Sequence, residues 1–425
     1  MELRLDYGTD GLLVTLPDDR VTVIEPISRP AAPDPHRTLL DAIRNPIDSP
    51  PLRERARPGK RVAISVCDIT RAQPRQLQIE ALLEEMPGVR DEDITILIAT
   101  GTHRANTPAE LERMLGASFV RRFRIINHDA RDAKVLQQVG TTTSGVPAYL
   151  NRAWIDADVR ITTGFVEPHF FAGFSGGPKM VAPGLAGLDT VMLLHDAARI
   201  AHPLSTWGVT EGNPIQRDVR EIARMVPVDF SLDVTLNREQ KITAAFAGDI
   251  LAQHGRACAY AKETVMRAVP KPFDVVLTTN SGYPLDQNLY QAVKGMSAAA
   301  TIVKPAGTIV CAAECRDGLP NHGSYGAVLA SQPNPAQLLA MITAAGYSVP
   351  DQWQVQVQAQ IQMKARVLVR TSGLDAAGVR AAHFEPVDDV ACAVREALDR
   401  AGADATLCVL PQGPQTIPYI DAAST

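Results

Sequence analysis

The sequence predicts an α/β protein of two domains whose largely parallel sheets are flanked by helices. First, a chain of 425 residues is too long for one ordinary hydrophobic core. Second, short continuous apolar runs recur along the chain, as expected for parallel strands that are buried on both faces. Third, helical stretches follow several of these runs, and strands that alternate with helices are typical of parallel sheets.

The expected strands coincide with the apolar runs, which lie at residues 62–66, 94–99, 159–162, 274–278 and 308–311. An amphipathic stretch over 76–85 follows the first run, and Pro108 opens a helix after the second. A long helical stretch is expected over 250–268. Two prolines at 270 and 272 come directly after it and favour a domain boundary. We therefore expect an N-terminal domain over 1–269 and a C-terminal domain over 270–425.

One segment is ambiguous between strand and helix. Over 354–362 Gln alternates with apolar residues, which by period alone indicates a strand. Trp353, Val357 and Ile361 are also four residues apart, and Gln is a good helix former. Asp351 stands where a helix N-cap is expected, so we favour a helix.

Composition excludes several classes of protein. Apolar residues make up 45% of the chain and charged residues 21%, the balance of a folded, soluble protein. The net charge is −5 without any block of Lys and Arg, so neither nucleic acid nor an acidic membrane is an expected partner. The N-terminus has no secretory signal, and no run of about 18 apolar residues could span a membrane. We expect a cytoplasmic protein whose six cysteines are mostly buried free thiols.

Ligands of open α/β sheets bind just beyond the carboxyl ends of the strands. The loop after residue 66 contains Asp68 and Arg71, the loop after residue 99 contains His103, and the loop after residue 163 contains His169. Three of the loops that follow expected strands thus carry a cation or a histidine, and such loops are useful for function and costly for stability. They are therefore the first candidates for a functional site.

The densest stretch is the glycine-rich segment over 168–179, which contains Gly176, Gly177 and Lys179. Glycines let a backbone approach an anion closely, so a nucleotide phosphate site is one hypothesis and a simple turn is the other. The segment resembles a P-loop only superficially. Pro178 stands where that motif requires Gly, and Met180 stands where it requires Ser or Thr.

Histidine suits proton transfer near neutral pH and is the commonest metal ligand. His103, His169 and His195 are candidates for these roles. Five other histidines are expected to be ordinary hydrogen-bonding residues, namely His36, His128, His254, His322 and His383. No His-Glu-x-x-His motif occurs, which disfavours a zinc hydrolase of that type.

Four motifs together resemble the nickel-pincer lactate racemase family. They are Asp68-x-Thr70-Arg71-x-x-Pro74, the Gly-Thr-His-Arg run at 101–104, the stretch 168–184, and Asp-Gln-Asn-Leu-Tyr-Gln-Ala-Val-Lys-Gly at 286–295. The resemblance runs in matching order from about Asp68 to Trp353. It implies a two-domain α/β protein with its active site in the cleft between the domains. It also implies a racemase or epimerase of small 2-hydroxy acids.

The resemblance further implies a cofactor and a set of roles. The cofactor is a nickel-pincer nucleotide, pyridinium-3-thioamide-5-thiocarboxylic acid mononucleotide, made by accessory proteins and attached covalently through Lys179. His195 matches the nickel ligand, and His103 and His169 match the acid/base pair. Asp68 and Trp353 match supporting residues at the cofactor, beside Gly176 and Gly177. The residues that match the substrate-binding set are Arg71, Tyr290, Gln291 and Lys294.

Chemistry explains these residue types. The α-hydrogen of a 2-hydroxy acid is far from acidic, so its removal as hydride needs an electron sink such as a pyridinium ring. Loss of the hydroxyl proton needs a base, and return of hydride to the opposite face needs a second one. Phe165, Phe170, Phe171 and Phe174 either pack the core or line the site, and no extra cation is committed to a second carboxylate. Lactate-like substrates are therefore favoured over malate-like ones.

Two other functions stay open. A nucleotide-binding phosphotransferase would need a magnesium-binding Ser or Thr beside Lys179, where Met180 stands. A non-catalytic carrier of the nickel cofactor would need Lys179 and His195 but has no use for two acid/base histidines or for Arg71.

Overall fold

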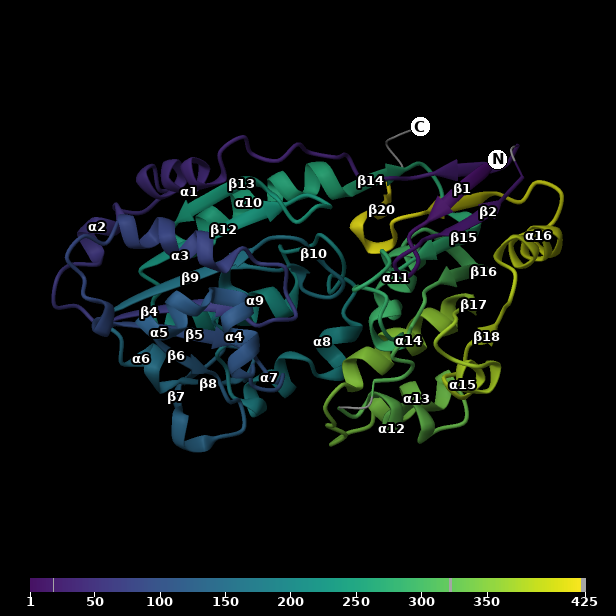
Figure 1. The fold of residues 1–425 in the computed structure, drawn as a ribbon. Helices are drawn as coiled ribbons and strands as arrows, with labels where there is room; N and C mark the ends of the chain where they lie inside the picture. The colour runs from purple at the N-terminus through teal and green to yellow at the C-terminus, as the bar shows by residue number, and fades with distance from the viewer. Residues whose placement is uncertain (18, 321–322, 422–425) are drawn as a thin grey trace. The chain divides into compact units, whose positions relative to one another are not determined.

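The computed structural model describes residues 1–17, 19–320 and 323–421, which form two compact units (Figure 1). Unit 1 comprises Met1–Ile27, Asp196–Ala201 and Val265–Thr425, and unit 2 comprises Ser28–His195 and His202–Thr264. These units differ from the expected ranges 1–269 and 270–425, because the first residues of the chain pack with its second half. Each unit is a sheet flanked by helices, so the expected α/β class is confirmed.

The sheet of unit 2 has six strands, whose neighbours run parallel except for β12 and β13. Their order is β13 (Ile242–Gly248), β12 (Phe230–Leu236), β9 (Val159–Phe165), β4 (Val62–Cys67), β5 (Ile94–Ala99) and β6 (Arg124–Asn127). The expected strands at 62–66, 94–99 and 159–162 thus form three neighbours. Because these strands are parallel, the loops that follow them leave the same edge of the sheet.

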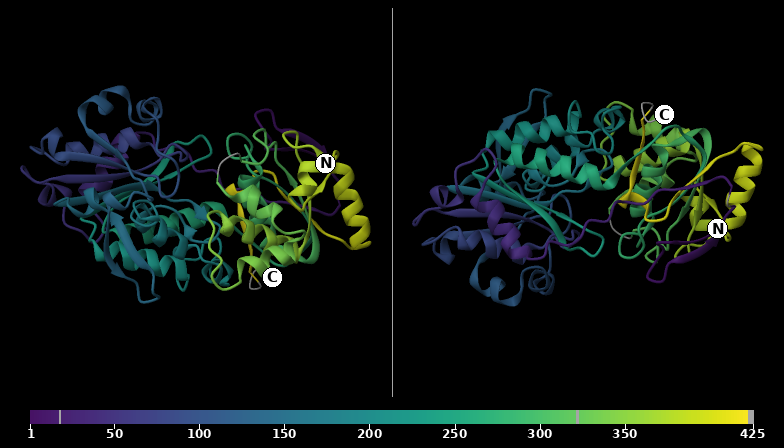
Figure 2. Two further views of the ribbon diagram at one scale, coloured as in Figure 1. Left: turned by 90° about the horizontal axis from the view of Figure 1, so that it is seen from below. Right: turned by 90° about the horizontal axis from the view of Figure 1, so that it is seen from above.

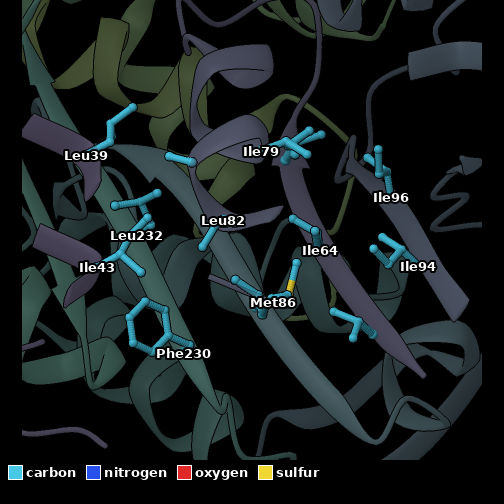
Figure 3. Packing of buried hydrophobic residues seen from close by; sticks show 14 of the residues in the cluster. Leu39, Ile43, Ile64, Ile79, Leu82, Met86, Ile94, Ile96, Phe230 and Leu232 are labelled. Carbon is cyan, nitrogen blue, oxygen red and sulfur yellow. The ribbon is translucent and has the colours of Figure 1, made fainter. Parts of the chain in front are cut away.

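Helices α1 (Pro35–Arg44) and α3 (Arg75–Glu84) cover one face of this sheet. Figure 3 shows Leu39 of α1 and Ile79 of α3 packed over strand residues that include Ile64 and Leu232. Strand side chains alternate between faces, so Asp233, next to Leu232, points to the opposite face. The 3₁₀-helix η3 (Gly177–Met180) packs on the sheet there. Gln253 of α10 (Ile250–Val265) reaches the Asp233 side chain on that face.

The rest of unit 2 consists of short elements around the sheet. They are α2 (Leu52–Arg55), η1 (Asp91–Asp93), α4 (Pro108–Leu115), α5 (Ala117–Arg122), η2 (Ala133–Val135), β7 (Leu136–Thr141), β8 (Pro147–Asn151), α6 (Arg152–Ile155), β10 (Pro168–His169), β11 (Gly173–Phe174), α7 (Leu188–Leu194) and α9 (Pro214–Met225). The small β10–β11 hairpin and α7 flank η3 in the chain.

The six-stranded sheet of unit 1 is parallel throughout. Its order is β18 (Glu385–Pro386), β17 (Arg366–Arg370), β16 (Val303–Ala312), β15 (Phe273–Thr279), β19 (Leu407–Leu410) and β3 (Val21–Val23). Helices α11 (Leu289–Ala300) and α14 (Gln352–Lys364) pack on one face. The other elements are α8 (Ala197–Ala201), β14 (Met266–Val269), α12 (Tyr325–Ala330), α13 (Pro335–Ile342), α15 (Ala376–Ala381), η4 (Gly413–Gln415) and β20 (Ile417–Ile420).

The N-terminal hairpin of β1 (Glu2–Leu5) and β2 (Leu12–Thr15) explains why the chain begins in unit 1. Both views of Figure 2 place this hairpin beside α16 (Val390–Ala401). Leu5 and Val14 are buried in the same hydrophobic cluster as Val394 of α16 and Leu277 of β15. The chain then adds β3 to the edge of the sheet before it enters unit 2.

Three local expectations had different outcomes. The segment 354–362 is helical, as expected, within α14. Asp351 does not cap that helix with its side chain, because its carboxylate instead accepts the backbone N–H of Ser324 at 2.8 Å. The helix expected over 250–268 ends at Val265, because the next residues pair with β20 as strand β14.

Two findings concern the composition. All six cysteines are free thiols, and Cys392 is the one that is not buried. Within the ranges that the structure describes, no helix is long and apolar enough to cross a membrane.

Candidate active site

The loop after β4 is shaped by a residue that the motifs did not single out. Arg75 is buried, and its guanidinium donates hydrogen bonds to the backbone carbonyls of Cys67, Asp68 and Arg71. Gln73 adds a contact by accepting the backbone N–H of Cys67 at 2.7 Å. The loop therefore closes on the Arg75 side chain. It buries the Asp68 carboxylate and leaves Arg71 exposed.

Asp68 and His103 form a hydrogen-bonded pair across two adjacent strand ends. Nδ1 of His103 lies 2.6 Å from Oδ2 of Asp68, and the Thr70 hydroxyl donates to Oδ1 at 2.6 Å. Burial acts to raise the pKa of the Asp68 carboxyl, but these hydrogen bonds and the charges of His103 and Arg71 outweigh it and lower that pKa. An ionised carboxylate accepts only, so Nδ1 of His103 carries a proton. Nε2 of the neutral ring is then the basic nitrogen.

His169 has the opposite arrangement. It ends β10, and its Nδ1 accepts the backbone N–H groups of Phe171 and Ala172 at 3.5 and 3.3 Å. Because a backbone N–H can only donate, Nδ1 is the unprotonated nitrogen of this ring. The proton of the neutral ring therefore lies on Nε2. His103 and His169 thus present different tautomers.

His195 follows the last residue of α7 as its C-cap. Its buried Nδ1 donates to the carbonyl of Val191 at 2.7 Å, which leaves the lone pair on Nε2. Burial lowers the pKa of His195 to about 4; the bond to Val191 acts in the opposite direction, and the charge of Lys179 adds to the lowering. The ring is therefore neutral near pH 7, as a metal ligand must be.

The ring of Phe171 lies near Lys179, His169 and His195. Its ring centroid lies 5.2 Å from that of His195 and 4.5 Å from that of His169. The ammonium of Lys179 lies 5.9 Å from the same ring centroid. Lys179, His169 and His195 therefore surround one buried phenylalanine. The four phenylalanines of this region are all buried, so the segment is more enclosed than an ordinary surface loop.

Gly176 and Gly177 have positive φ angles of 74° and 49°, a conformation that favours glycine. A Cβ on Gly177 would lie 2.5 Å from the ring of His254. The N–H of Gly177 donates to Asp233 at 2.9 Å. Close packing within the protein therefore accounts for these two glycines. Neither Asp233 nor Gln253, its partner, stands out in the sequence, and His254 was expected to be structural.

A second group of expected residues gathers in unit 1, around α11. Lys294 donates to the side-chain carbonyl of Gln291 at 2.6 Å, one turn apart on the helix. The indole N–H of Trp353 lies 3.3 Å from the hydroxyl of Tyr290. Gln354, which follows Trp353 on α14, donates to the backbone carbonyl of Tyr290 at 2.6 Å. The helices α11 and α14 thus bring Tyr290 and Trp353 together.

The other histidines have structural partners where the structure describes them. His128 contacts the carbonyl of Ala186, and His383 contacts that of Leu329. His254 contacts the carbonyl of Ser175 at 2.8 Å, and His36 pairs with Glu84. His322 lies outside the described residues.

The donor set can be tested against a nickel cofactor. Within the described ranges, no three His, Cys, Asp or Glu side chains are grouped so that they could hold a metal ion. His195 beside Lys179 fits a group that is anchored on an amine and brings its own soft donors, because one neutral imidazole then completes the metal site.

Comparisons with known proteins identify the class, a two-domain α/β isomerase. The family model described as the lactate racemase N-terminal domain matches residues 7–208, and the model of the C-terminal domain matches residues 268–417. Lactate racemase of Thermoanaerobacterium thermosaccharolyticum is 34% identical over 424 residues, covering 98% of each chain. Lactate racemase of Lactiplantibacillus plantarum is 37% identical over 380 residues, covering 88% of this chain and 89% of the relative.

Solved structures agree. The lactate racemase apoprotein of T. thermosaccharolyticum superimposes with a TM-score of 0.91 at 33% identity, covering 98% of this chain and 100% of the other. A Thermotoga maritima protein shares the fold alone, with a TM-score of 0.68 at 19% identity over 92% of this chain and 100% of its own. The chain belongs to the lactate racemase family.

Proposed function

We propose that this protein racemises lactate or a closely similar 2-hydroxy acid, with a nickel-pincer nucleotide attached to Lys179. The lactate racemases among its relatives support the substrate class. The observation that carries the proposal is the cluster of Lys179, His169 and His195 around Phe171. In this proposal Lys179 anchors the cofactor and His195 supplies the protein's nickel ligand. The bound cofactor would accept and return the hydride of the substrate α-carbon.

The two acid/base histidines would handle the proton of the substrate hydroxyl. His103, whose Nδ1–H is held by Asp68, has a basic Nε2 that can accept a proton. His169 is assigned the other role: as the imidazolium it would return a proton to the substrate oxygen, whereas the Nε2–H of its neutral ring only donates a hydrogen bond. Racemisation needs this pair, because the hydroxyl proton is lost to one residue and regained from another.

The substrate carboxylate needs cations. Arg71 in unit 2 is exposed, and its loop is held by Arg75. In unit 1, the ammonium of Lys294 donates to the side-chain carbonyl of Gln291. We assign substrate binding to Arg71 of unit 2 and to Tyr290, Gln291 and Lys294 of unit 1. Trp353, held against Tyr290, and Asp68 are assigned to support of the cofactor.

Intact-mass measurement after co-expression with cofactor-synthesising proteins, the expected transient partners, tests the proposal. The loaded protein should show one mass excess that maps to Lys179 by peptide analysis, with equimolar nickel. Lys179→Arg, which keeps the charge but lacks the primary amine, should remove the mass excess while leaving the thermal unfolding midpoint unchanged. A nucleotide that remains covalently bound to the variant would refute the tether.

Substrate choice is tested by steady-state rates of the loaded protein on D-lactate and D-malate. The buried phenylalanines around His169 favour a small apolar substituent. Lactate should therefore turn over faster, and faster turnover of malate would reverse the ordering. A phosphotransferase remains disfavoured, because Met180 beside Lys179 is buried and offers magnesium no hydroxyl. We place the protein in the cytoplasm on the strength of its free thiols.

A further inference from the structure

We propose that Asp233 is a positioning residue for Lys179, and that Gln253 and His254 assist it. The inference rests on the proposed role of Lys179 only for its functional meaning, since the contacts themselves stand without it. Asp233 lies on β12 and Lys179 lies on η3. The helix η3 packs on the face of the sheet to which the Asp233 side chain points. The aspartate is completely buried and is not part of the acid/base pair.

Asp233 holds the first residue of η3. Its Oδ2 accepts the backbone N–H of Gly177 at 2.9 Å and the side-chain amide of Gln253 at 2.7 Å. The same amide donates to the Ser231 hydroxyl at 2.8 Å, so Gln253 is itself fixed on α10. Gln253 thus orients the Asp233 carboxylate, and the carboxylate in turn accepts the N–H of Gly177, two residues before Lys179.

The residues just before Gly177 also pack against Asp233 and His254. His254 contacts the carbonyl of Ser175 at 2.8 Å, and its ring fills the space where a Cβ of Gly177 would lie. A Cβ on Gly176 would lie 2.9 Å from the carbonyl of Phe165 and 3.1 Å from Oδ1 of Asp233. Asp233 and His254 therefore bond to the backbone from Ser175 to Gly177 and pack closely against it, just before Lys179.

A buried carboxylate is an expensive way to support an ordinary turn. Oδ1 of Asp233 is buried without a hydrogen-bond partner among the described residues, and burial of such a group costs stability. We infer that this cost is offset by accurate placement of the Lys179 amine, because a group attached covalently to that amine takes its position from the lysine. The support also explains why the chain uses two consecutive glycines here.

Lys179 acylation tests the inference in the protein without cofactor. The wild type, Asp233→Ala and Asp233→Asn are treated with a water-soluble amine acylating reagent, and the rate at Lys179 is compared with the rate at exposed Lys60 in the same digest. Loss of the bond to Gly177 should release the loop and raise the Lys179 rate by about fivefold in Asp233→Ala. Asp233→Asn keeps an oxygen at the Oδ2 position and should stay within about twofold of the wild type.

Glu85→Ala is the matched control. Glu85 is also a buried carboxylate of unit 2, but it pairs with Arg44 and Arg53 beyond the end of α3, on the other face of the sheet. It should lower stability without changing the Lys179 rate. An equal rise in this control, or an unchanged rate in Asp233→Ala, would overturn the inference.

Two further outcomes are distinguishable. If Asp233→Ala does not fold, Gln253→Leu replaces it, because that change removes the donor that orients the carboxylate. It should raise the Lys179 rate in the same direction, and no rise would again contradict the inference. If the co-expressed wild type carries no mass on Lys179 while acylation behaves as expected, the proposed function fails and the positioning role stands.

Discussion

His103 and His169 differ in which ring nitrogen carries the proton. Asp68 holds a proton on Nδ1 of His103, whereas two backbone N–H groups keep Nδ1 of His169 unprotonated. Neither tautomer is readable from a sequence, because each depends on a partner that the fold supplies. Asp68 lies 35 residues before His103 in the chain.

Single replacement of either histidine should suppress racemisation in both directions, because each turnover of the proposed mechanism uses both residues. General acid/base catalysis contributes about 10²- to 10⁴-fold, so His103→Ala and His169→Ala should each lose at least about 10²-fold. One enantiomer should still transfer its hydride in each variant, visible as bleaching of the pyridinium absorbance with that enantiomer alone. A loss of well under tenfold in a variant would remove that histidine from the mechanism.

The pH dependence of stability should change sign between two buried carboxylates. Burial raises the pKa of Asp233 from 3.8 to about 6, against the bonds from Gln253 and Gly177. The folded protein therefore holds this proton more tightly than the unfolded chain. Relative to Asp233→Asn, the wild type should lose stability as pH rises from about 4 to 7, on the order of 2–3 kcal/mol in the free energy of unfolding.

Glu85 is the matched comparison for this measurement. Burial acts to raise the pKa of Glu85, but the hydrogen bonds from Arg53 and Arg44 outweigh it and lower that pKa. Relative to Glu85→Gln, the wild type should therefore gain stability as pH rises through the pKa of an ordinary glutamate. Urea unfolding at about pH 4 and pH 7 measures the free energy of unfolding of the wild type, Asp233→Asn and Glu85→Gln. Parallel slopes for the two pairs would contradict the assignment of Asp233.

At the scale of elements, α14 shows how a polar helix is buried. Gln352, Gln354, Gln356 and Gln358 are all buried, and their side-chain amides bond to groups of neighbouring segments. Gln358, for example, donates to the carbonyl of Ala382 at 2.8 Å and accepts from the Tyr325 hydroxyl. The alternation of Gln with apolar residues therefore reflects burial around most of the helix, and not the two faces of a strand.

Replacement of Gln358 by Leu should be much more costly than the same change at Gln360, which is only partly buried. Gln358→Leu leaves a carbonyl and a hydroxyl buried without their partner, at about 2 kcal/mol or more in the free energy of unfolding. Gln360→Leu should change it by less than about 0.5 kcal/mol. Chemical denaturation of both variants checks the difference, and equal losses would mean that helix propensity alone decides.

For the whole molecule, the path of the chain makes a prediction about its two units. Leu5 and Leu39 both lie before residue 269 and are both fully buried, yet Leu5 packs in unit 1 and Leu39 in unit 2. Leu5→Ala should reduce hydrogen-exchange protection in β15 and β19, whereas Leu39→Ala should reduce it in β9 and β12. Each change should cost about 2–5 kcal/mol. If Leu5→Ala instead weakened β9 and β12, the domain range 1–269 would be right.

Much of the architecture is local and could be predicted from the sequence. Apolar runs such as 94–99 mark strands, because a strand buried on both faces needs continuous apolar side chains. The helix that begins at Pro108 carries its own capping box, in which Thr107 and Glu110 satisfy each other's backbone N–H groups. The loops with Asp68, His103 and His169 follow from the rule that parallel strands end at one edge.

Long-range contacts decide the rest. Residues 266–269 continue a helical pattern but form a strand, because β20, about 150 residues later, offers them a partner. Asp233 matters because the fold brings the backbone N–H of Gly177 to it, and Gln253 matters because its side-chain amide meets Ser231 and Asp233. Arg75 acts within its own loop, which folds back onto its guanidinium. The sequence alone names the candidate reactive side chains, since their chemistry belongs to the residue type. Their tautomers, their burial and the support under Lys179 come from the tertiary structure, because hydrogen bonds and solvent exclusion depend on neighbours in space.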